Sequence, residues 1–395
     1  MDLAQTPDAE LMAWLAWLRA PGAGGAVLRQ ALARHGSAAA AREAALAAPA
    51  EHGLPRAAHA LLERPEREQQ ARDWAWLEAP GHALLTLSDE AYPPLLRACS
   101  DAPPALFVAG SIDALWLPQL AIVGSRNASP AGLEHARDFS ATLARAGFSI
   151  VSGLALGIDA AAHVAALAAG GHTVAVCATG LDRVYPERHR ELSQRILAQG
   201  ALISEFPLGT VARSDHFPRR NRIIAGLALG TLVIEAGLRS GSLITARLAG
   251  ERGREVFALP GSLHNPLARG CHRLIREGAT LVESADDVIE PLRPLLGQLQ
   301  AELASTGVAA RPALPRGPAR DPDYQRLLTA LGHDPATLDQ LAERSGLAAA
   351  ALASMLLILE LDGEVAALAG ARYARTHARA LAAVSLDSSS TSGID

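Results

Sequence analysis

The segment LAIVGSRNASPAGLEHARDFSATLARAGFSIVSGLALGID, residues 120–159, decides how this chain folds. It contains an apolar run, a turn rich in glycine and serine, a stretch with helical periodicity, and a second apolar run that ends in another glycine turn. Continuous apolar runs are typical of strands buried on both faces, and a helix between two of them makes the strands parallel. The segment therefore predicts one unit of an α/β fold.

The same alternation of strand and helix extends over residues 80–300. Helical stretches separate the later apolar runs, and one of these helices is expected over residues 223–229. We predict a doubly wound, parallel α/β sheet with helices on both faces. Nine apolar runs are its candidate strands: ALLTL, ALFVAG, LAIVGS, FSIVSG, TVAVCA, ALISEF, TLVIEAG, EVFALPG and TLVES.

Other patterns flank this region. Residues 1–75 contain helical stretches joined by glycine and proline turns, with scattered arginines, and predict a small packing domain. Residues 301–322 are rich in Pro, Gly and Arg and are typical of a linker. Residues 323–380 predict three helices and a hairpin, the order of a winged helix-turn-helix. The polar residues 381–395 predict a disordered tail.

The presumed recognition helix of the winged-helix segment spans residues 348–360 and contains no basic residue. Glu360, Asp362 and Glu364 add negative charge at its end. A helix that enters a DNA groove normally carries Arg or Lys. We therefore expect this element to contact protein or to be structural, and not to bind DNA.

The composition excludes several classes of protein. The chain has a formal net charge of −5 and contains no lysine, so neither a Walker-type phosphate loop nor a pyridoxal Schiff base is available. The three cysteines are odd in number and far apart, which argues against a disulfide framework or a zinc cluster. No apolar run approaches the ~18–20 residues of a membrane span, and the first residues lack signal-peptide features. We expect a cytoplasmic protein.

Glycine, serine and arginine follow several of the predicted strands. The carboxyl ends of parallel strands meet at one edge of a sheet, where ligands of α/β proteins bind. Glycines allow backbone amides to approach a ligand, serines donate hydrogen bonds, and arginine supplies fixed positive charge. The recurrence of such loops predicts an anion-binding face, formed by Gly124, Ser125, Arg126, Ser152, Gly153, Gly180, Gly241 and Ser242.

The segment DHFPRRNRIIAGL, residues 215–227, places a cluster of basic residues directly before the predicted apolar helix. Residues 205–277 contain eleven Arg against six Asp or Glu, in a chain that is acidic overall. A basic island of this kind indicates a surface for a polyanion. Repeated phosphates suit several Arg and amide pockets, and an aromatic ring beside them can stack on an unpaired base. We expect a nucleic-acid site that includes Phe217, Arg219, Arg220, Asn221 and Arg222.

The sequence also allows structural roles for the same charged residues, as partners in ion pairs within the domain. One arginine of the cluster can pair with Glu205 or Glu235, and Arg222 is the candidate because it lies nearest the apolar helix. Arg126 can pair with Asp159. The glycine spacing in SGLALG does not match a dinucleotide-binding fingerprint, and none of the common hydrolase or metalloprotease motifs occurs.

Seven motifs occur in order: AIVGSR, SGLALGIDAAAH, ATGLDRVYP, ISEFPLGT, HFPRRNRIIAGL, VIEAGLRSGSLITA and ALPGS. They resemble the DNA-processing protein A family, also called Smf or DprA, strongly over residues 120–290 and with extension to both flanking domains. The resemblance implies an extended Rossmann-like domain that dimerises, a SAM-like helical domain before it, no catalytic activity, and no cofactor. It implies a protein that carries single-stranded DNA to the RecA recombinase during natural transformation and protects that DNA.

The resemblance also assigns roles to residues. Gly124, Ser125 and Arg126 look like the family's phosphate-binding Gly-Ser/Thr-Arg motif, and residues 217–222 resemble its basic loop. Many members have Lys where this chain has an arginine of that loop, which keeps the charge. An alternative of another class is a nucleotide-processing enzyme similar to the phosphoribohydrolases, because VIEAGLRSGS resembles their glycine-rich loop and nearby Glu.

Overall fold

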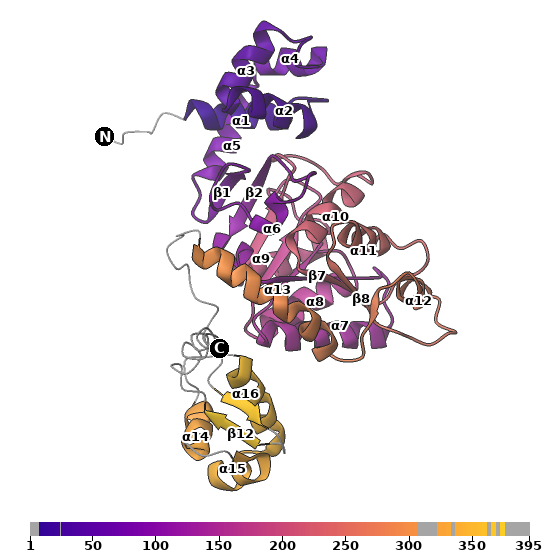
Figure 1. The fold of residues 1–395 in the computed structure, drawn as a ribbon. Helices are drawn as coiled ribbons and strands as arrows, with labels where there is room; N and C mark the ends of the chain where they lie inside the picture. Colours follow the sequence, from indigo (N-terminus) through magenta and orange to yellow (C-terminus); the bar gives the residue numbers. More distant parts are fainter. Residues whose placement is uncertain are drawn as a thin grey trace, which may run out of the picture. The chain divides into compact units, whose positions relative to one another are not determined.

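The computed structural model describes residues 8–23, 25–305, 322–332, 336–361, 365–368 and 372–375. The chain forms two compact units, Met1–Ala309 and Ala310–Asp395 (Figure 1). Among the described helices, none has the length and apolar character that a membrane crossing requires.

The first unit is built on a nine-stranded sheet with the order β1-β2-β6-β5-β4-β3-β7-β8-β9. Seven neighbouring strands are parallel, while β1 and β2 run antiparallel at one edge. All nine predicted apolar runs form strands, and the doubly wound fold is confirmed. The strands are β1 (His82–Thr86), β2 (Ala105–Gly110), β3 (Gln119–Val123), β4 (Ser149–Ser152), β5 (Thr173–Val176), β6 (Ala201–Ser204), β7 (Gly230–Val233), β8 (Glu255–Ala258) and β9 (Thr280–Leu281).

The antiparallel edge differs from the all-parallel expectation. Between β1 and β2 the chain forms only the one-turn helix α6 (Pro94–Arg97). A parallel crossover is usually made by a longer helix that covers the sheet. The apolar runs alone could not show this, because buried strands of either direction have the same pattern.

Seven helices follow the later strands in the order expected for a doubly wound fold. On the central strand β3, Leu120 and Ile122 share a core with α7, α8 and α13, whereas Ala121 and Val123 share a core with α10, α11 and α12. Alternate residues of one strand thus pack against two helical layers. The helices are α7 (Pro130–Arg145), α8 (Ile158–Ala168), α9 (Arg190–Gln199), α10 (His216–Leu227), α11 (Ser242–Glu251), α12 (Arg269–Arg276) and α13 (Asp286–Ser305).

The strand order reverses at β3. This strand pairs with β4 on one side and with β7 on the other. In open α/β sheets, ligands bind at such a switch point, in the crevice outside the carboxyl ends of the strands. The sheet therefore brings together the loops that follow β3, β4 and β7.

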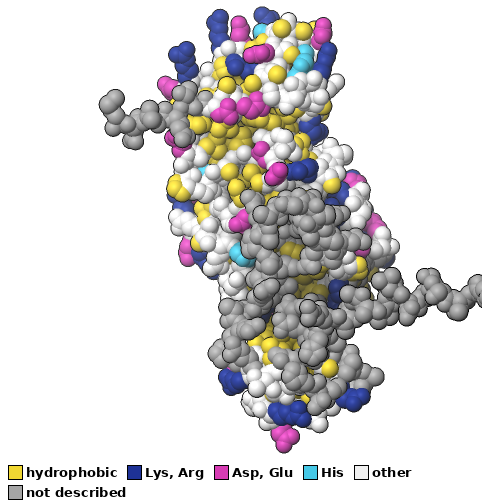
Figure 2. Space-filling model, turned by 60° about the vertical axis from the view of Figure 1, so that its left-hand side comes forward, with side chains coloured by type: hydrophobic (Ala, Val, Ile, Leu, Met, Phe, Trp, Pro, Cys, Tyr) yellow, Lys and Arg dark blue, Asp and Glu magenta, His cyan; other side chains and the backbone are white. Residues whose placement is uncertain are grey.

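Five helices precede the sheet. Their core includes Trp14 and Trp17 and also Ala105 of β2, so the helices pack against the antiparallel edge. Arg29 Nη1 donates to the carbonyl of Ala102 over 2.7 Å, directly before β2. On the face that Figure 2 shows, basic and acidic side chains are intermixed over this helical part. The helices are α1 (Ala9–Arg19), α2 (Gly25–His35), α3 (Ala38–Ala47), α4 (Arg56–Glu63) and α5 (Arg67–Leu77).

The second unit has the order of a winged helix. A capping box between Thr337 and Gln340 starts α15, and Gly346 ends it in a left-handed conformation with φ of 69°. The sheet has the antiparallel order β10-β12-β11. The elements are α14 (Pro322–Leu331), β10 (Ala336–Thr337), α15 (Leu338–Ser345), α16 (Ala349–Leu361), β11 (Val365–Leu368) and β12 (Arg372–Arg375).

Several sequence predictions fall at the ends of these elements. Helix α13 continues to Ser305, into the first part of the predicted linker. The rest of that linker, residues 306–321, lies outside the described residues, as do Asp362, Glu364 and the predicted tail. Helix α16, which matches the presumed recognition helix, carries no basic residue.

Candidate nucleic-acid interface

The loop after β3 presents Arg126 to solvent. A Cβ on Gly124 would lie 2.6 Å from Ile158 Cγ1, so only glycine lets this loop pass so close to α8. Ser125 is buried, and its carbonyl accepts the N–H of Ile158 over 3.2 Å. The next side chain, Arg126, is exposed. The local packing thus fixes the backbone and turns the arginine outward.

Arg126 lies on an aromatic ring and not against a carboxylate. Its Cζ is 4.9 Å from the centroid of the Phe217 ring. No ion pair joins Arg126 to Asp159 or to any other described residue. A cation over an aromatic face keeps its full charge and most of its donors. Arg126 is therefore available to an anion.

Helix α10 begins at His216, seven residues before the predicted start at residue 223. The basic segment 217–222 is consequently helical, and the expectation of a basic loop is wrong in this respect. Arg219 and Arg222 stand three residues apart and share one face of the helix. The apolar pattern concealed these first turns, because Arg220 and Arg222 occupy positions that pack inward.

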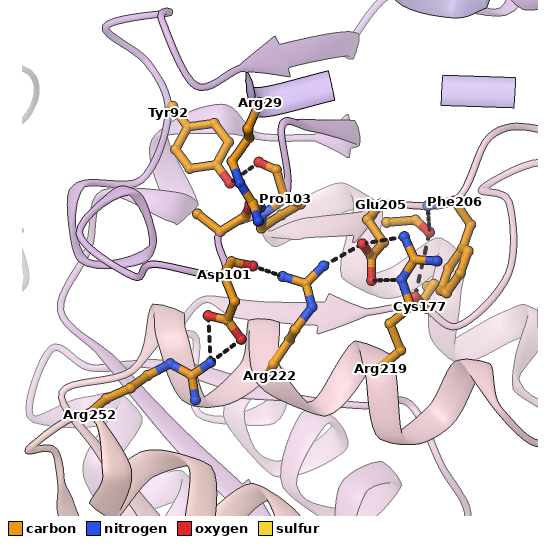
Figure 3. Close-up of polar contacts among 12 residues, drawn as sticks. Arg29, Tyr92, Asp101, Pro103, Cys177, Glu205, Phe206, Arg219, Arg222 and Arg252 are labelled. Atoms are coloured by element: carbon orange, nitrogen blue, oxygen red, sulfur yellow. Dashed lines mark hydrogen bonds and ion pairs between the residues drawn. The ribbon is translucent and has the colours of Figure 1, made fainter. Parts of the chain in front are cut away.

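Glu205, which follows β6, forms ion pairs with both of these arginines (Figure 3). Arg219 donates Nε to Oε1 over 3.0 Å and Nη2 to Oε2 over 2.9 Å, and Arg222 also bonds Oε2. The pairing of Arg222 with Glu205, considered as an alternative to a phosphate contact, is thus present. The side chain of Arg222 is only 16% exposed, whereas that of Arg219 is 51% exposed. Only Arg219 of this pair faces solvent broadly.

The contacts of Arg222 continue into a wider network. Arg222 Nη1 donates to the carbonyl of Asp101, whose carboxylate accepts Arg252 Nη2 over 2.7 Å (Figure 3). This network joins α10, α11 and the segment before β2. Arg222 therefore fastens elements of the domain together.

Arg220 lies in the interior, with 3% of its surface exposed. Its guanidinium donates to the carbonyls of Gly153 and Val176, at the carboxyl ends of β4 and β5. Burial lowers the pKa of Arg220 and raises the pKa of Asp159, and the opposite charges of the two groups counteract both shifts. Gly153 makes room for this arrangement, because a Cβ there would lie 2.3 Å from Arg220 Nη1. The structure therefore places Arg220 as a brace, although the sequence analysis expected it to meet phosphates.

Two carboxylates of the protein itself lie at the crevice, one bonded to the N-terminus of α7 and one, in the first turn of α8, bonded to the loop before that helix. Glu235, after β7, accepts the N–H of Ser129 over 2.8 Å and its hydroxyl over 2.7 Å at the start of α7. Asp159 accepts the N–H of Gly153 over 3.1 Å and that of Ala155 over 3.3 Å at the start of α8. Dinucleotide-binding folds hold a pyrophosphate at the N-terminus of a helix that follows a strand, and Glu235 takes this place at α7. The arrangement leaves little place for an enclosed nucleotide.

The remaining predicted site residues divide into buried and exposed positions. Ser152 is buried and donates to the carbonyl of Ile122 over 2.6 Å. Gly180 and Ser242 are also buried, while Gly241 is exposed at the start of α11. Asn221 Nδ2 donates to the carbonyl of Gly241 over 3.3 Å and so braces that loop.

One further residue enters the site that sequence reasoning did not single out. The ring of Tyr185, in the loop after β5, has its centroid 5.6 Å from that of Phe217. The tyrosine belongs to the motif ATGLDRVYP, but a lone Tyr before Pro gives no signal of exposure. Among the predicted site residues, Arg126, Arg219 and Gly241 are thus exposed and Phe217 is half-buried, and the exposed Tyr185 lies beside Phe217.

Comparison with known proteins shows that this fold belongs to a family of DNA recombination mediators. Residues 83–293 match the family model described as DNA recombination-mediator protein A, and residues 310–371 match the DprA winged helix domain. The chain belongs to the DprA family.

Individual relatives agree with this assignment. The chain is 46% identical to Protein Smf of Escherichia coli over 303 residues, which covers 75% of this chain and 78% of the relative. It is 48% identical to DNA processing protein DprA of Streptococcus pneumoniae over 204 residues, 52% of this chain and 72% of the relative. The X-ray structure of DprA from Streptococcus pneumoniae matches with a TM-score of 0.64 and 37% identity, covering 71% of this chain and 97% of that chain.

Proposed function

We propose that this protein binds single-stranded DNA at the carboxyl edge of its sheet and delivers that DNA to the RecA recombinase, protecting it during natural transformation. The observation that carries the proposal is Arg126, which is exposed, makes no ion pair with any described residue and lies over Phe217. A guanidinium in this setting can grip a phosphate with two hydrogen bonds. A strand that bonds Arg126 also brings its bases next to two aromatic rings.

The preference for single strands follows from the kind of side chains at the site. Arg126 and Arg219 suit phosphates, and the neighbouring rings suit the faces of unpaired bases. In a duplex those faces are stacked and inaccessible. Among the described elements, the helix that would enter a groove, α16, has no basic residue.

Delivery to RecA and dimerisation through the Rossmann-like domain are the finer parts of the proposal. They rest on membership of a recombination-mediator family. In this proposal the protein is not an enzyme. The acidic groups near the crevice, Asp159, Glu205 and Glu235, all hold internal hydrogen bonds or ion pairs. The phosphoribohydrolase alternative is disfavoured because Glu235 is buried and its carboxylate accepts hydrogen bonds from Ser129 and Asn265.

Fluorescence anisotropy with a labelled oligonucleotide tests the proposed site. Arg126→Ala is expected to weaken binding about ten- to hundredfold, the equivalent of one charge-assisted hydrogen-bonded contact. Arg72→Ala is the matched control, since Arg72 is 67% exposed on a helix far along the chain from the site. The melting temperatures of both variants should stay close to that of the wild type. An unchanged dissociation constant for Arg126→Ala would remove this residue from the site.

Two further assays test the finer parts. The wild type should stimulate ATP hydrolysis by RecA on single strands coated with single-strand binding protein, and Arg126→Ala should not. Incubation with nucleoside monophosphates should release no free base. Released base would instead favour the phosphoribohydrolase alternative.

A further inference from the structure

Tyr185 is unusual among the aromatic side chains of this protein. Among the described residues, the exposed large apolar side chains are Tyr185, Val211, Leu238, Leu263 and Leu281, and Tyr185 is the only aromatic one. Its surface is 49% exposed. Burial of this exposed ring surface against a ligand would be favourable.

The loop that carries Tyr185 is held firmly on both sides. Thr179 Oγ1 donates to the carbonyl of Arg183 over 3.1 Å, and the carboxylate of Asp182 accepts the N–H of Gly209 over 2.8 Å. Beyond the tyrosine, His189 Nδ1 bonds the carbonyl of Leu154 over 2.9 Å. The ring is therefore presented by a braced loop, and an aromatic fixed in this way loses little conformational entropy when a ligand stacks on it.

The position of the ring relates it to the proposed DNA site. Tyr185 lies beside Phe217 with a ring-centroid distance of 5.6 Å and an interplanar angle of 49°. Phe217 is itself partly covered by the guanidinium of Arg126, which lies over its ring. Three elements thus meet at one point: the loop after β3, the loop after β5, and the first turn of α10. Of the two rings, Tyr185 has the larger exposed surface.

We propose that Tyr185 is a stacking surface for a base of the single strand whose phosphate Arg126 binds. This inference rests on the proposed function and adds a residue and a mode of contact to it. In this proposal the two aromatic residues have different roles: the ring of Phe217 packs against the guanidinium of Arg126, and the ring of Tyr185 stacks on the base. Stacking on an aromatic tolerates any sequence, because every base has a π face.

The test compares two oligonucleotides of equal length, oligo-dT and a strand of abasic sites that keeps the phosphates. Loss of one base–aromatic stack corresponds to about a five- to hundredfold loss of affinity. Tyr185→Ala should show such a loss on oligo-dT while its affinity for the abasic strand stays within about twofold of wild type. Tyr185→Phe should retain wild-type affinity on both strands, because it keeps the ring.

Tyr185→Leu is the control for a folding defect in the alanine variant, since leucine keeps apolar volume but has no aromatic face. It should behave like the alanine variant, with a melting temperature near that of the wild type. Equal losses on both strands, or no loss on oligo-dT, would overturn the stacking role. If the wild type binds neither strand, the proposed function itself fails, and the stacking proposal fails with it.

Discussion

Three arginines within four residues of one another have three different environments in this protein. Arg219 is half-exposed on Glu205, Arg222 is nearly buried between Glu205 and Asp101, and Arg220 is buried against backbone carbonyls. The side chains are chemically identical, so their roles are set by burial and by the acceptors they meet. A buried guanidinium with satisfied donors stabilises the fold, whereas an exposed one remains available to a ligand.

Substitution of the paired arginines should separate stability from binding. Arg222→Ala should lower the free energy of unfolding by about 1–3 kcal/mol, because charge-assisted hydrogen bonds in a part-buried network are lost. Arg219→Ala should cost less than about 1 kcal/mol, as expected for a half-exposed pair, yet weaken binding to single strands about tenfold. Denaturant unfolding and anisotropy on the same preparations measure both. The opposite order of the two stabilities would contradict this division.

Two glycines allow a matched test of the buried arginine. Gly153→Ala would place a Cβ 2.3 Å from Arg220 Nη1 and should destabilise the protein by about 1–3 kcal/mol, as overpacking does. Gly250→Ala adds the same methyl group inside α11, where the nearest atom is 3.9 Å away. That variant should be stabilised by up to about 1 kcal/mol through helix propensity. Chemical denaturation compares the two, and a stable Gly153→Ala protein would mean that Arg220 is not held as described.

At the scale of elements, the sequence predicted the strands well and one helix poorly. Strands β2 to β7 are short runs buried on both faces, so local composition identifies them. Helix α10 was placed too late because its first turns carry three arginines whose acceptors come from other parts of the fold. The pairing of Arg219 and Arg222 with Glu205 depends on a strand that lies more than ten residues away in sequence. Periodicity of apolar residues cannot reveal such a contact.

The same limit applies to the site. Arg126 and Phe217 could be named from the sequence because a strand end and a basic cluster point to them. The exposure of Tyr185 depends on two loops and a helix turn that meet in space, and the burial of Arg220 depends on carbonyls at two strand ends. Neither the exposure of Tyr185 nor the burial of Arg220 produces a pattern in the neighbouring sequence.

A buried hydrogen bond links helix α8 to strand β5. His163 Nδ1 bonds Thr173 Oγ1 over 2.6 Å, and Thr173 in turn donates to the carbonyl of Ile150, so His163 is the donor. Its Nε2 is buried without a hydrogen-bond partner among the described residues. Burial lowers the pKa of His163 to about 3, and the positive charge of His189 and Arg220 adds to this effect. The imidazole is therefore neutral in the folded protein.

The lowered pKa of His163 predicts that the stability of the protein depends on pH. Below about pH 6.5 the unfolded chain protonates His163 and the folded one does not, so the free energy of unfolding falls by up to about 1.4 kcal/mol per pH unit. The fall continues as the pH approaches the folded pKa of about 3. His163→Asn keeps a donor for Thr173 and removes the titration, so it should show a smaller fall between about pH 6.5 and 4.5. Urea unfolding at several pH values measures the free energy of unfolding of both proteins. If it falls equally steeply with pH in the wild type and in His163→Asn, His163 is not the group responsible.

At the scale of the whole molecule, the proposed DNA site is built from residues of the first unit alone. The first unit contains the sheet, the crevice and every residue proposed to contact DNA. A chain truncated after Ser305 should therefore bind oligo-dT with an affinity within about twofold of wild type. Circular dichroism checks that it folds. A folded truncation that no longer binds would move the site out of the first unit.

The most direct test of the central claim measures binding of single strands and of blunt duplex over a range of salt concentrations. Two arginines that neutralise phosphates, Arg126 and Arg219, should give a salt dependence with a slope near −0.7 for each contact, about −1.4 in total. Arg126→Ala should reduce that slope by about 0.7 while single strands remain preferred over duplex. Equal affinity for blunt duplex, or a slope that Arg126→Ala leaves unchanged, would contradict the assignment of a single-strand site to this edge of the sheet.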